Sequence, residues 1–222
     1  YIYSPSGAVR DRVAFRRGVR VLRQAGHEVT VDPAALHVDT RFAGSDVERL
    51  SAIERAAQSG ARATLISRGG YGLTRLLSDL PYAEIRKSID RGTHWVGFSD
   101  FTALQLSVLA RTGRITWSGP SLCDTLGSPT GVDDVTFACF SDVLDGQGEG
   151  AGWRMSARSV QALANRKSGV WARDAMLWGG NLSVLCSLLG SRYFPEVSGG
   201  VLFLEDVGEH PYRIERLLTQ LL

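Results

Sequence analysis

The chain has 222 residues, of which 44% are hydrophobic and 22% charged, and its formal net charge is +2. These values are typical of a globular protein with one large domain, or one domain and part of a second. So small a charge does not indicate nucleic-acid binding, and no apolar run approaches the roughly 20 residues that span a bilayer. We therefore expect neither nucleic acid nor a membrane among its partners.

The first part of the chain alternates β-rich runs with amphipathic helical runs. Strands are predicted at 1–3, 27–31, 63–67, 94–98 and 115–117. Helices are predicted at 9–25, 73–90 (with a break at Pro81), 100–111 and 135–144. A further helix is predicted to start at a capping box formed by Ser45 and Glu48 and to end at Gly60. This alternation predicts an α/β fold whose mainly parallel sheet carries helices on both faces. Because the sequence begins at Tyr1 inside a strand-like run, we expect a few residues to precede it.

Two side-chain groups have simple interpretations. Four arginines cluster on the first predicted helix, and such a cluster is typical of a solvated helix face: Arg16, Arg17, Arg20 and Arg23. The three cysteines, Cys123, Cys139 and Cys186, are odd in number and form no CxxC pair. They predict reduced thiols in a cytoplasmic protein rather than disulfides or metal ligands, and no HExxH motif is present.

Composition changes after residue 145. Alternating glycines at 146–152 favour a linker, since no strand runs into them and no GKS or GKT follows, as a phosphate-binding loop requires. We predict an N-terminal domain at 1–145, a linker at 146–168 and a second, incomplete α/β domain at 169–222. The second domain would hold strands at 170–178 and 201–204 and helices at 181–189 and 211–222. The last helix would expose an apolar face, so we expect further chain after Leu222: Ile214, Leu217, Leu218, Leu221 and Leu222.

Ser99 is the best candidate for a nucleophile. It lies between a predicted strand that ends in Gly97-Phe98 and a predicted helix that starts at Asp100. A tight strand-to-helix turn projects a side chain above the sheet and points backbone N–H groups to the space beside it. The local sequence is GFSD rather than GxSxG, and from these four residues alone a simple helix N-cap is the favoured interpretation of Ser99.

Two other segments follow predicted strands and therefore belong to the same end of the molecule. Arg68-Gly69-Gly70-Tyr71-Gly72 is either a loop whose free N–H groups help to form an oxyanion hole or a tight packing turn. Glu205, followed by Asp206, closes the strand at 201–204; it either orients a catalytic histidine or is an exposed acidic strand end.

A serine nucleophile needs a base, and four histidines are available. His94 precedes Ser99 on the same strand by roughly 16 Å, at about 3.3 Å per residue, and cannot reach it. His27 begins a strand at the wrong end of the sheet, and His37 lies in a polar loop. For His210, just before a helix, a surface or packing role is the better interpretation. The residues alone leave the triad incomplete.

An ordered set of short motifs resembles the LD-carboxypeptidase family of serine peptidases, which includes the microcin C immunity proteins. The matching segments span nearly the whole chain, and in order they are Ser4-Pro5-Ser6-Gly7, Arg68-Gly69-Gly70-Tyr71-Gly72, Gly97-Phe98-Ser99-Asp100-Phe101-Thr102-Ala103-Leu104, Gly119-Pro120, Gly179-Gly180-Asn181-Leu182, Leu202-Phe203-Leu204-Glu205-Asp206 and Pro211-Tyr212-Arg213-Ile214-Glu215-Arg216. Ser118 stands where family members often carry histidine.

The resemblance implies that Ser99 is the nucleophile, Glu205 the triad carboxylate, and the N–H groups of Gly70 and Asp100 the oxyanion hole. It also implies a cytoplasmic homodimer, without metal or cofactor, that releases the terminal D-alanine of murein tetrapeptide during cell-wall recycling. The family's catalytic histidine lies downstream of the 211–216 segment, beyond these 222 residues, so we expect them alone to hydrolyse little. The alternatives are an immunity-type hydrolase of a peptidyl-nucleotide antibiotic and a non-catalytic peptide-binding module.

Overall fold

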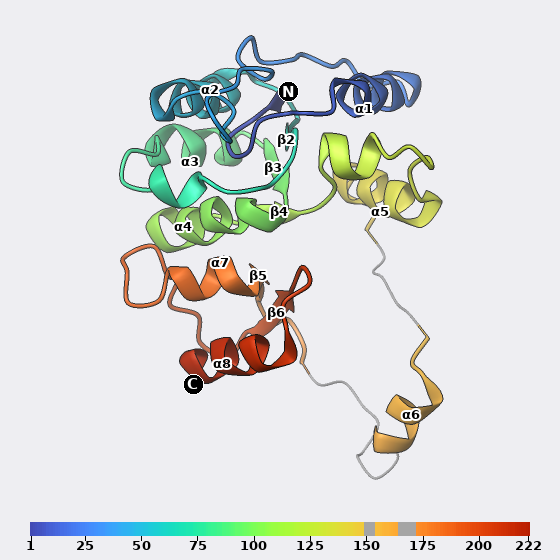
Figure 1. The fold of residues 1–222 in the computed structure, drawn as a ribbon, viewed down its shortest axis with the longest axis vertical. Helices are drawn as coiled ribbons and strands as arrows, with labels where there is room; N and C mark the ends of the chain where they lie inside the picture. The colour runs from blue at the N-terminus through green and yellow to red at the C-terminus, as the bar shows by residue number, and fades with distance from the viewer. Residues whose placement is uncertain (149–153, 164–171) are drawn as a thin grey trace.

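The computed structural model describes residues 1–148, 154–163 and 172–222 (Figure 1). Its strands are β1 (Ile2–Tyr3), β2 (Ala63–Ile66), β3 (His94–Gly97), β4 (Trp117–Ser118), β5 (Leu177–Asn181) and β6 (Val201–Glu205). Its helices are α1 (Arg12–Gln24), α2 (Asp46–Gln58), α3 (Tyr82–Asp90), α4 (Thr102–Thr112), α5 (Asp134–Leu144), α6 (Ala157–Leu163), α7 (Leu182–Ser187) and α8 (Pro211–Leu221). The short turns are η1 (Leu73–Arg75), η2 (Ser99–Phe101) and the π-helical η3 (Leu122–Leu126).

Within the described residues, the larger sheet has four parallel strands in the order β1-β2-β3-β4. Ile2 pairs with Leu65, and Leu65 pairs with Val96, so these three side chains share one face of the sheet. Because side chains alternate along a strand, the neighbouring residues Tyr3 and Trp95 point to the opposite face. Both faces are therefore apolar, as expected of a parallel sheet covered on both sides.

Each face of this sheet has its own hydrophobic core. Tyr3 and Trp95 pack among residues of α2, α3, α4 and α7, whereas Leu65 and Val96 pack among residues of α1, η3 and α5. Figure 1 shows α2, α3 and α4 stacked along one side of the sheet and α1 and α5 on the other. The predicted α/β fold with helices on both faces is confirmed.

The strand predicted at 27–31 is wrong. In the described chain, Val31 makes only an isolated bridge to Ile2, flanked by hydrogen bonds from Ile2 N to Thr30 O and from Asp32 N to Ile2 O, each 2.8 Å. His27 and Glu28 are exposed and polar, so pairing them with the sheet would bury no apolar surface.

Two other elements begin at residues that differ from the predicted ones. The first helix begins at Arg12 rather than near residue 9, because the Asp11 carboxylate accepts hydrogen bonds from Val13 N and Ala14 N, each 2.8 Å, and caps it. The strand predicted at 170–178 is β5, which lies several residues later; residues 170 and 171 are outside the described chain. Its position follows from its parallel pairing with β6, which runs from Leu177 opposite Val201 to Asn181 opposite Glu205.

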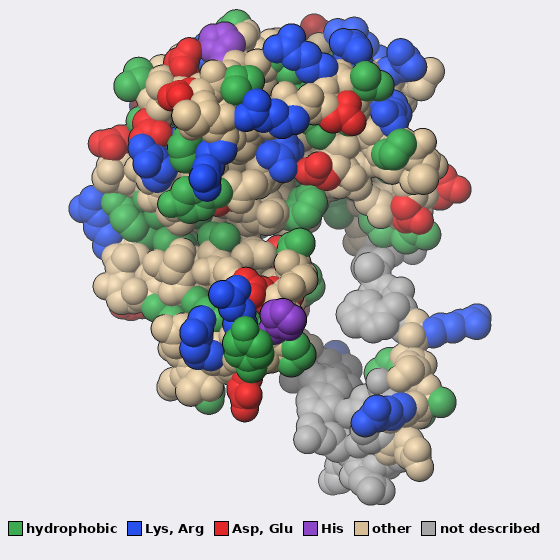
Figure 2. All heavy atoms as spheres, viewed as in Figure 1, with side chains coloured by type: hydrophobic (Ala, Val, Ile, Leu, Met, Phe, Trp, Pro, Cys, Tyr) green, Lys and Arg blue, Asp and Glu red, His purple; other side chains and the backbone are tan. Residues whose placement is uncertain are grey.

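The arginines of the first helix lie at the surface, as predicted. Arg16, Arg20 and Arg23 are exposed and Arg17 is half-buried, while Phe15, Val19 and Leu22 face the core. Figure 2 shows Lys and Arg side chains gathered over the region of α1. This arrangement is that of an ordinary amphipathic helix.

The C-terminal lobe consists of β5, β6, α7 and α8. Helix α8 has no fully buried residue, but it rests on α7, where Cys186 Sγ donates a hydrogen bond to Leu217 O at 3.4 Å. As a result Ile214, Leu217 and Leu221 are half-buried, and only Leu218 and Leu222 of the predicted apolar face are exposed. The face is therefore partly covered by α7.

The segment between the two lobes holds α6, a helix that the linker prediction for 146–168 did not include. Residues 149–153 and 164–168 of that predicted linker lie outside the described chain. None of the helices in the described parts is long and apolar enough to cross a membrane. All three cysteines carry free thiols.

The predicted capping box opens α2. Ser45 N donates to Glu48 Oε2 at 2.8 Å, and Glu48 N donates to Ser45 Oγ at 3.3 Å. The second carboxylate oxygen, Oε1, lies 2.8 Å from Nδ1 of His37. These contacts favour the charged form, the Ser45 N–H most of all, and lower the pKa of Glu48 from 4.5 to about 2.

We expect Glu48→Gln to weaken the acid dependence of stability. Because the folded-state pKa is below the unfolded one, the contribution of Glu48 is complete above about pH 4.5 and is lost as pH falls toward 2. Urea unfolding at several pH values should therefore show a shallower loss between pH 4.5 and 2 in Glu48→Gln than in the unchanged protein. Glu54→Gln, on the same helix and exposed, is the control and should leave the slope unchanged.

Candidate active site

Ser99 occupies a strained turn between β3 and α4. Its φ is +64°, a left-handed conformation that costs a non-glycine residue about 1–3 kcal/mol. Phe98, not Ser99, is the N-cap of η2, and no side-chain capping bond is present there. The half-exposed Ser99 hydroxyl has no hydrogen-bond partner in the described chain. The N-cap interpretation of Ser99 is therefore wrong.

The glycine loop that follows β2, residues 69–72, lies directly against Ser99. A Cβ atom at Gly69 would be 2.8 Å from Ser99 Oγ and 2.9 Å from Ser99 Cβ, so only glycine fits there. Gly7 N donates to Gly69 O at 3.2 Å. Since the C=O and N–H of a trans peptide point in opposite directions, the N–H of Gly70 points away from Gly7. Gly70 itself has a φ of +118°, which favours glycine.

Asp100 joins the nucleophile turn to the glycine loop through its side chain. It is 2% exposed, and its Oδ2 accepts a hydrogen bond from Leu73 N at 3.0 Å. Burial raises the pKa of Asp100, and the N–H of Leu73 acts against that rise. The carboxylate thus holds the end of the 69–72 loop next to the turn that carries Ser99.

Glu205 reaches the same region from the C-terminal lobe. It ends β6 opposite Asn181 of β5, and Asn181 N donates to Thr102 Oγ1 of α4 at 3.0 Å. Because Thr102 is three residues after Ser99, this hydrogen bond attaches the tip of the small sheet to the first turn of the nucleophile helix. Within the described residues, the buried Oε1 of Glu205 has no hydrogen-bond partner.

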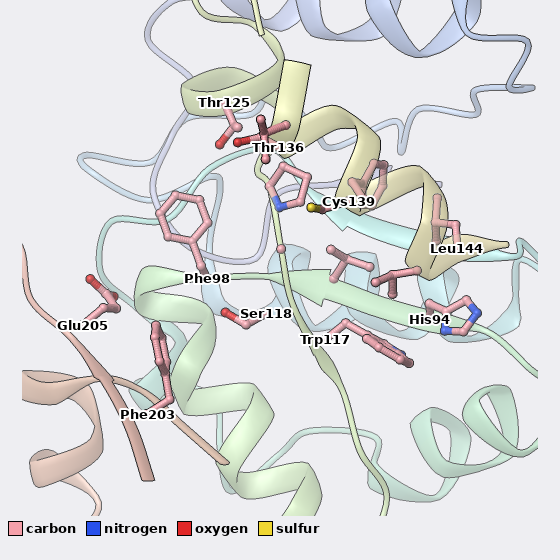
Figure 3. A pocket seen from close by; sticks show the side chains of 16 residues that line it. His94, Phe98, Trp117, Ser118, Thr125, Thr136, Cys139, Leu144, Phe203 and Glu205 are labelled. Carbon is pink, nitrogen blue, oxygen red and sulfur yellow. The ribbon is translucent and has the colours of Figure 1, made fainter. Parts of the chain in front are cut away.

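A pocket of about 570 Å³ lies between the two lobes (Figure 3). Phe98, which follows β3, and Ser118 of β4 contribute to its wall, as do Phe203 and Glu205 of β6, and α5 closes it with apolar side chains. Figure 3 shows Phe98 and Glu205 at the same end of the pocket. The residue before Ser99 and the carboxylate of the second lobe therefore border one cavity.

Of the four histidines, His94 lines the pocket at the opposite end from Phe98 and Glu205 (Figure 3), and the other three lie elsewhere. His37 pairs with Glu48, and His94 packs edge-on against Trp117 with ring centroids 5.3 Å apart. Burial, followed by the charge of Arg62, lowers the pKa of His94. His27 is exposed, and His210 is exposed and stacked on Tyr212. None of them is hydrogen-bonded to Ser99 in the described chain.

Sequence reasoning assigned no role to two residues that organise the site. Thr102 receives the small sheet, and Arg49 of α2 is fully buried beneath the glycine loop. Thr102 lies in the motif around Ser99, but its partner is 79 residues away. Nothing in the sequence indicates that Arg49 is buried, since an arginine in the first turns of an amphipathic helix is normally solvated.

We expect Gly180→Ala to disrupt the attachment of the small sheet to α4. A Cβ at Gly180 would lie 2.5 Å from Thr102 Oγ1, and its φ of +133° is unfavourable for alanine. Denaturant unfolding should show a loss of about 2–4 kcal/mol, since overpacking adds to backbone strain. Gly190→Ala is the control, because Gly190 has a φ of +73° with open space around it; its expected loss is about 1 kcal/mol. Equal losses would mean that the Thr102 contact is not tight.

Comparisons with known proteins agree with this arrangement. The sequence model of the LD-carboxypeptidase N-terminal domain matches residues 1–119, and that of the LD-carboxypeptidase C-terminal domain matches residues 174–222. The murein tetrapeptide carboxypeptidase of Pseudomonas aeruginosa is 33% identical over 199 residues, which cover 84% of this chain and 60% of that protein.

Two solved structures have the same fold. The muramoyltetrapeptide carboxypeptidase from Oxalobacter formigenes matches with a TM-score of 0.75 and 33% identity, over 99% of this chain and 69% of that one. MccF in complex with glutamyl sulfamoyl guanosine matches with a TM-score of 0.81 and 25% identity, over 99% and 71%.

The similarity extends over nearly all of the chain but not over all of its relatives. The chain spans between 60% and 68% of the length of three further bacterial relatives, with which it shares 30% to 32% identity. Family models match both lobes, and the motifs around Ser99 and Glu205 fall inside the matched segments. The chain therefore belongs to the LD-carboxypeptidase family.

Proposed function

We propose that the full-length protein is a cytoplasmic serine-type LD-carboxypeptidase that releases the terminal D-alanine of murein tetrapeptide in cell-wall recycling. The observation that carries the proposal is the turn at Ser99: an unbonded hydroxyl in a left-handed conformation, directly against a glycine loop. Strain of this kind persists where the surrounding structure requires it, and it is frequent at nucleophile turns. The named relatives that act on murein peptides support the choice of substrate.

In the proposed reaction, Ser99 Oγ attacks the carbonyl carbon of the bond before D-alanine. A histidine, oriented by Glu205, takes the hydroxyl proton and transfers it to the amine of D-alanine as the C–N bond breaks. Water then hydrolyses the ester left on Ser99, giving its proton back through the same histidine to the serine oxygen. None of the four histidines pairs with Ser99, so we assign the base to the third of the relatives' length that this chain does not cover. The buried, unpartnered Oε1 of Glu205 is suited to accept an N–H from an imidazole.

The oxyanion of the tetrahedral intermediate would be bound by the N–H groups of Gly70 and Asp100. Asp100 N lies at the start of a helical turn, where N–H groups are free and the potential is positive. One such donor contributes about 3–4 kcal/mol to transition-state stabilisation in serine enzymes. The Asp100 carboxylate also accepts a hydrogen bond from Leu73 N, the residue that follows the loop containing Gly70.

A second candidate is hydrolysis of a peptidyl-nucleotide antibiotic. The specific observation in its favour is the match to MccF, whose structures hold glutamyl sulfamoyl guanosine and aspartyl sulfamoyl adenosine. It would use the same triad, with the acyl-nucleotide in place of the murein peptide.

The deciding experiment gives the full-length protein each substrate and detects products by mass spectrometry. We expect release of D-alanine from murein tetrapeptide, and none from a matched peptide that ends in L-alanine. Faster cleavage of aspartyl sulfamoyl adenosine would favour the immunity function instead. Binding of the tetrapeptide without turnover of any of these substrates would leave a peptide-binding module.

The proposal includes a homodimer. Light scattering of the full-length protein should give twice the mass of one chain, and a monomer at micromolar concentration would contradict this part without affecting the catalytic assignment.

A further inference from the structure

A charged side chain with no surface exposure lies beneath the glycine loop. Arg49 of α2 has 0% exposure, although arginine is almost never fully buried unless its charge is paired. Its Nη2 pairs with the Asp46 carboxylate. Its Nη1 donates to two backbone carbonyls, Pro5 O at 2.9 Å and Gly72 O at 3.1 Å. The guanidinium therefore connects α2 to two separate loops.

Both loops belong to the surroundings of Ser99. Pro5 lies two residues before Gly7, whose N–H donates to Gly69 O in the glycine loop. Gly72 ends that loop and rests directly on the guanidinium, since a Cβ at Gly72 would lie 2.6 Å from Nη1 of Arg49. One side chain thus holds the loop through Gly72 and also holds its neighbour through Pro5.

The peptide unit between Gly72 and Leu73 is bonded at both of its polar groups. Its C=O accepts from Arg49, and its N–H donates to the carboxylate of Asp100. Because these two groups point in opposite directions, the two side chains hold the peptide plane from opposite sides. Rotation of this plane would break both bonds, so the orientation of the end of the glycine loop is determined.

The guanidinium is itself held in place. Its central carbon lies 4.8 Å from the centroid of the Phe42 ring, a cation–π contact. Phe42 also packs against Tyr71 of the glycine loop, with centroids 6.1 Å apart. Asp46, which pairs with Nη2, is fixed in turn by Arg75 at 2.8 Å. Both Nη atoms are bound, while the buried Nε has no partner in the described chain. A planar fork held in this way cannot be replaced by another side chain of the same length.

We propose that Arg49 is a positioning residue for the oxyanion hole. Through the carbonyl of Gly72 it sets the conformation of the 69–72 loop, and so it sets the direction of the Gly70 N–H relative to Ser99. The inference rests on the proposed function, because it assigns to Arg49 an effect on that reaction.

The same helix provides a matched control. Arg55 is also bonded to a buried carboxylate, with Nε and Nη2 at 2.8 and 2.9 Å from Asp32, but it has no contact with the glycine loop. Substituting either arginine by glutamine breaks an ion pair of α2 and lowers stability. Only Arg49→Gln also removes the guanidinium donor of the Gly72 carbonyl, which keeps the longer bond from Arg75 N at 3.3 Å.

The test compares Arg49→Gln and Arg55→Gln in the full-length protein by kcat, KM and thermal unfolding. We expect both to unfold at lower temperature, and only Arg49→Gln to lose kcat, by roughly tenfold to a hundredfold, with KM within about twofold. Hydrogen exchange of peptides that cover residues 69–77 should become faster in Arg49→Gln only. A folded Arg49→Gln with the unchanged protein's kcat, or equal losses of kcat in both variants, would overturn the proposal.

Asp46→Asn decides the matter if Arg49→Gln does not fold. Asp46 is partly exposed, so this variant keeps the buried arginine but weakens its anchor and also removes the pair to Arg75. We expect a smaller loss of kcat and faster exchange at 69–77, and the absence of both refutes the proposal. Ser99→Ala is measured in parallel. If Ser99→Ala stays active, the proposed function fails; if it is inactive while the Arg49 and Asp46 variants are fully active, only the role of Arg49 fails.

Discussion

Ser99→Ala in the full-length protein is expected to abolish release of D-alanine from murein tetrapeptide, with a loss of kcat of roughly 10⁴-fold or more. The substitution removes the proposed nucleophile but not the turn, because the backbone hydrogen bonds around Phe98 and Phe101 do not involve the side chain. Initial rates, measured by coupled detection of free D-alanine, test this result. Undiminished turnover would refute the assignment of Ser99.

Ser99→Gly makes the same prediction sharper. Glycine also lacks the hydroxyl, but it accepts a φ of +64° without strain. We expect Ser99→Gly to be as inactive as Ser99→Ala. In denaturant unfolding it should be more stable than Ser99→Ala by about 1 kcal/mol. Thr40→Ala is the control, because Thr40 is an exposed hydroxyl residue with a φ of +52° at another place in the fold, and its activity should be unchanged.

Glu205→Gln is expected to lower kcat by roughly 10³-fold to 10⁴-fold while leaving KM nearly unchanged. The change keeps the shape of the side chain but removes the charge that would orient the catalytic histidine and stabilise its protonated form. Because glutamine presents an NH₂ group as well as a C=O, it also allows the wrong orientation of the imidazole. Steady-state kinetics on murein tetrapeptide measure the effect.

The neighbouring acid is the control for Glu205. Asp206 lies in the turn after β6, where its Oδ2 accepts a hydrogen bond from Glu209 N at 2.9 Å. Asp206→Asn keeps an acceptor oxygen for that bond, so its kcat should stay within about twofold of the unchanged protein. If both variants lost activity equally, the effect would be one of local charge, and the specific role of Glu205 would be wrong.

Segments with a strong local signal were predicted well. β2 and β3 begin at the predicted residues, Ala63 and His94, because each is a short apolar run between turns. The capping box at Ser45 and Glu48 formed as predicted, since all its contacts lie within four residues. The segment at 27–31 failed for the opposite reason, because strand formation depends on a partner that the local sequence does not contain.

In the candidate site, too, some features are indicated by the local sequence and others are not. Ser99 and the 69–72 loop stood out because glycine-rich turns after apolar strands leave a visible pattern. No local sequence pattern predicts the hydrogen bond from Asn181 to Thr102 or the burial of Arg49, because each depends on residues more than 20 positions away.

By itself the sequence determined the alternation of strands and helices, the parallel sheet and the strand end at which Ser99 lies. These features follow from side-chain periodicity and from turn residues, which act over a few neighbouring positions. Only the tertiary structure decided that Arg49 and Asp100 hold one peptide unit from opposite sides and that Glu205 borders the same pocket as Phe98. The physical reason is that burial and hydrogen bonding between distant segments depend on how the whole chain packs.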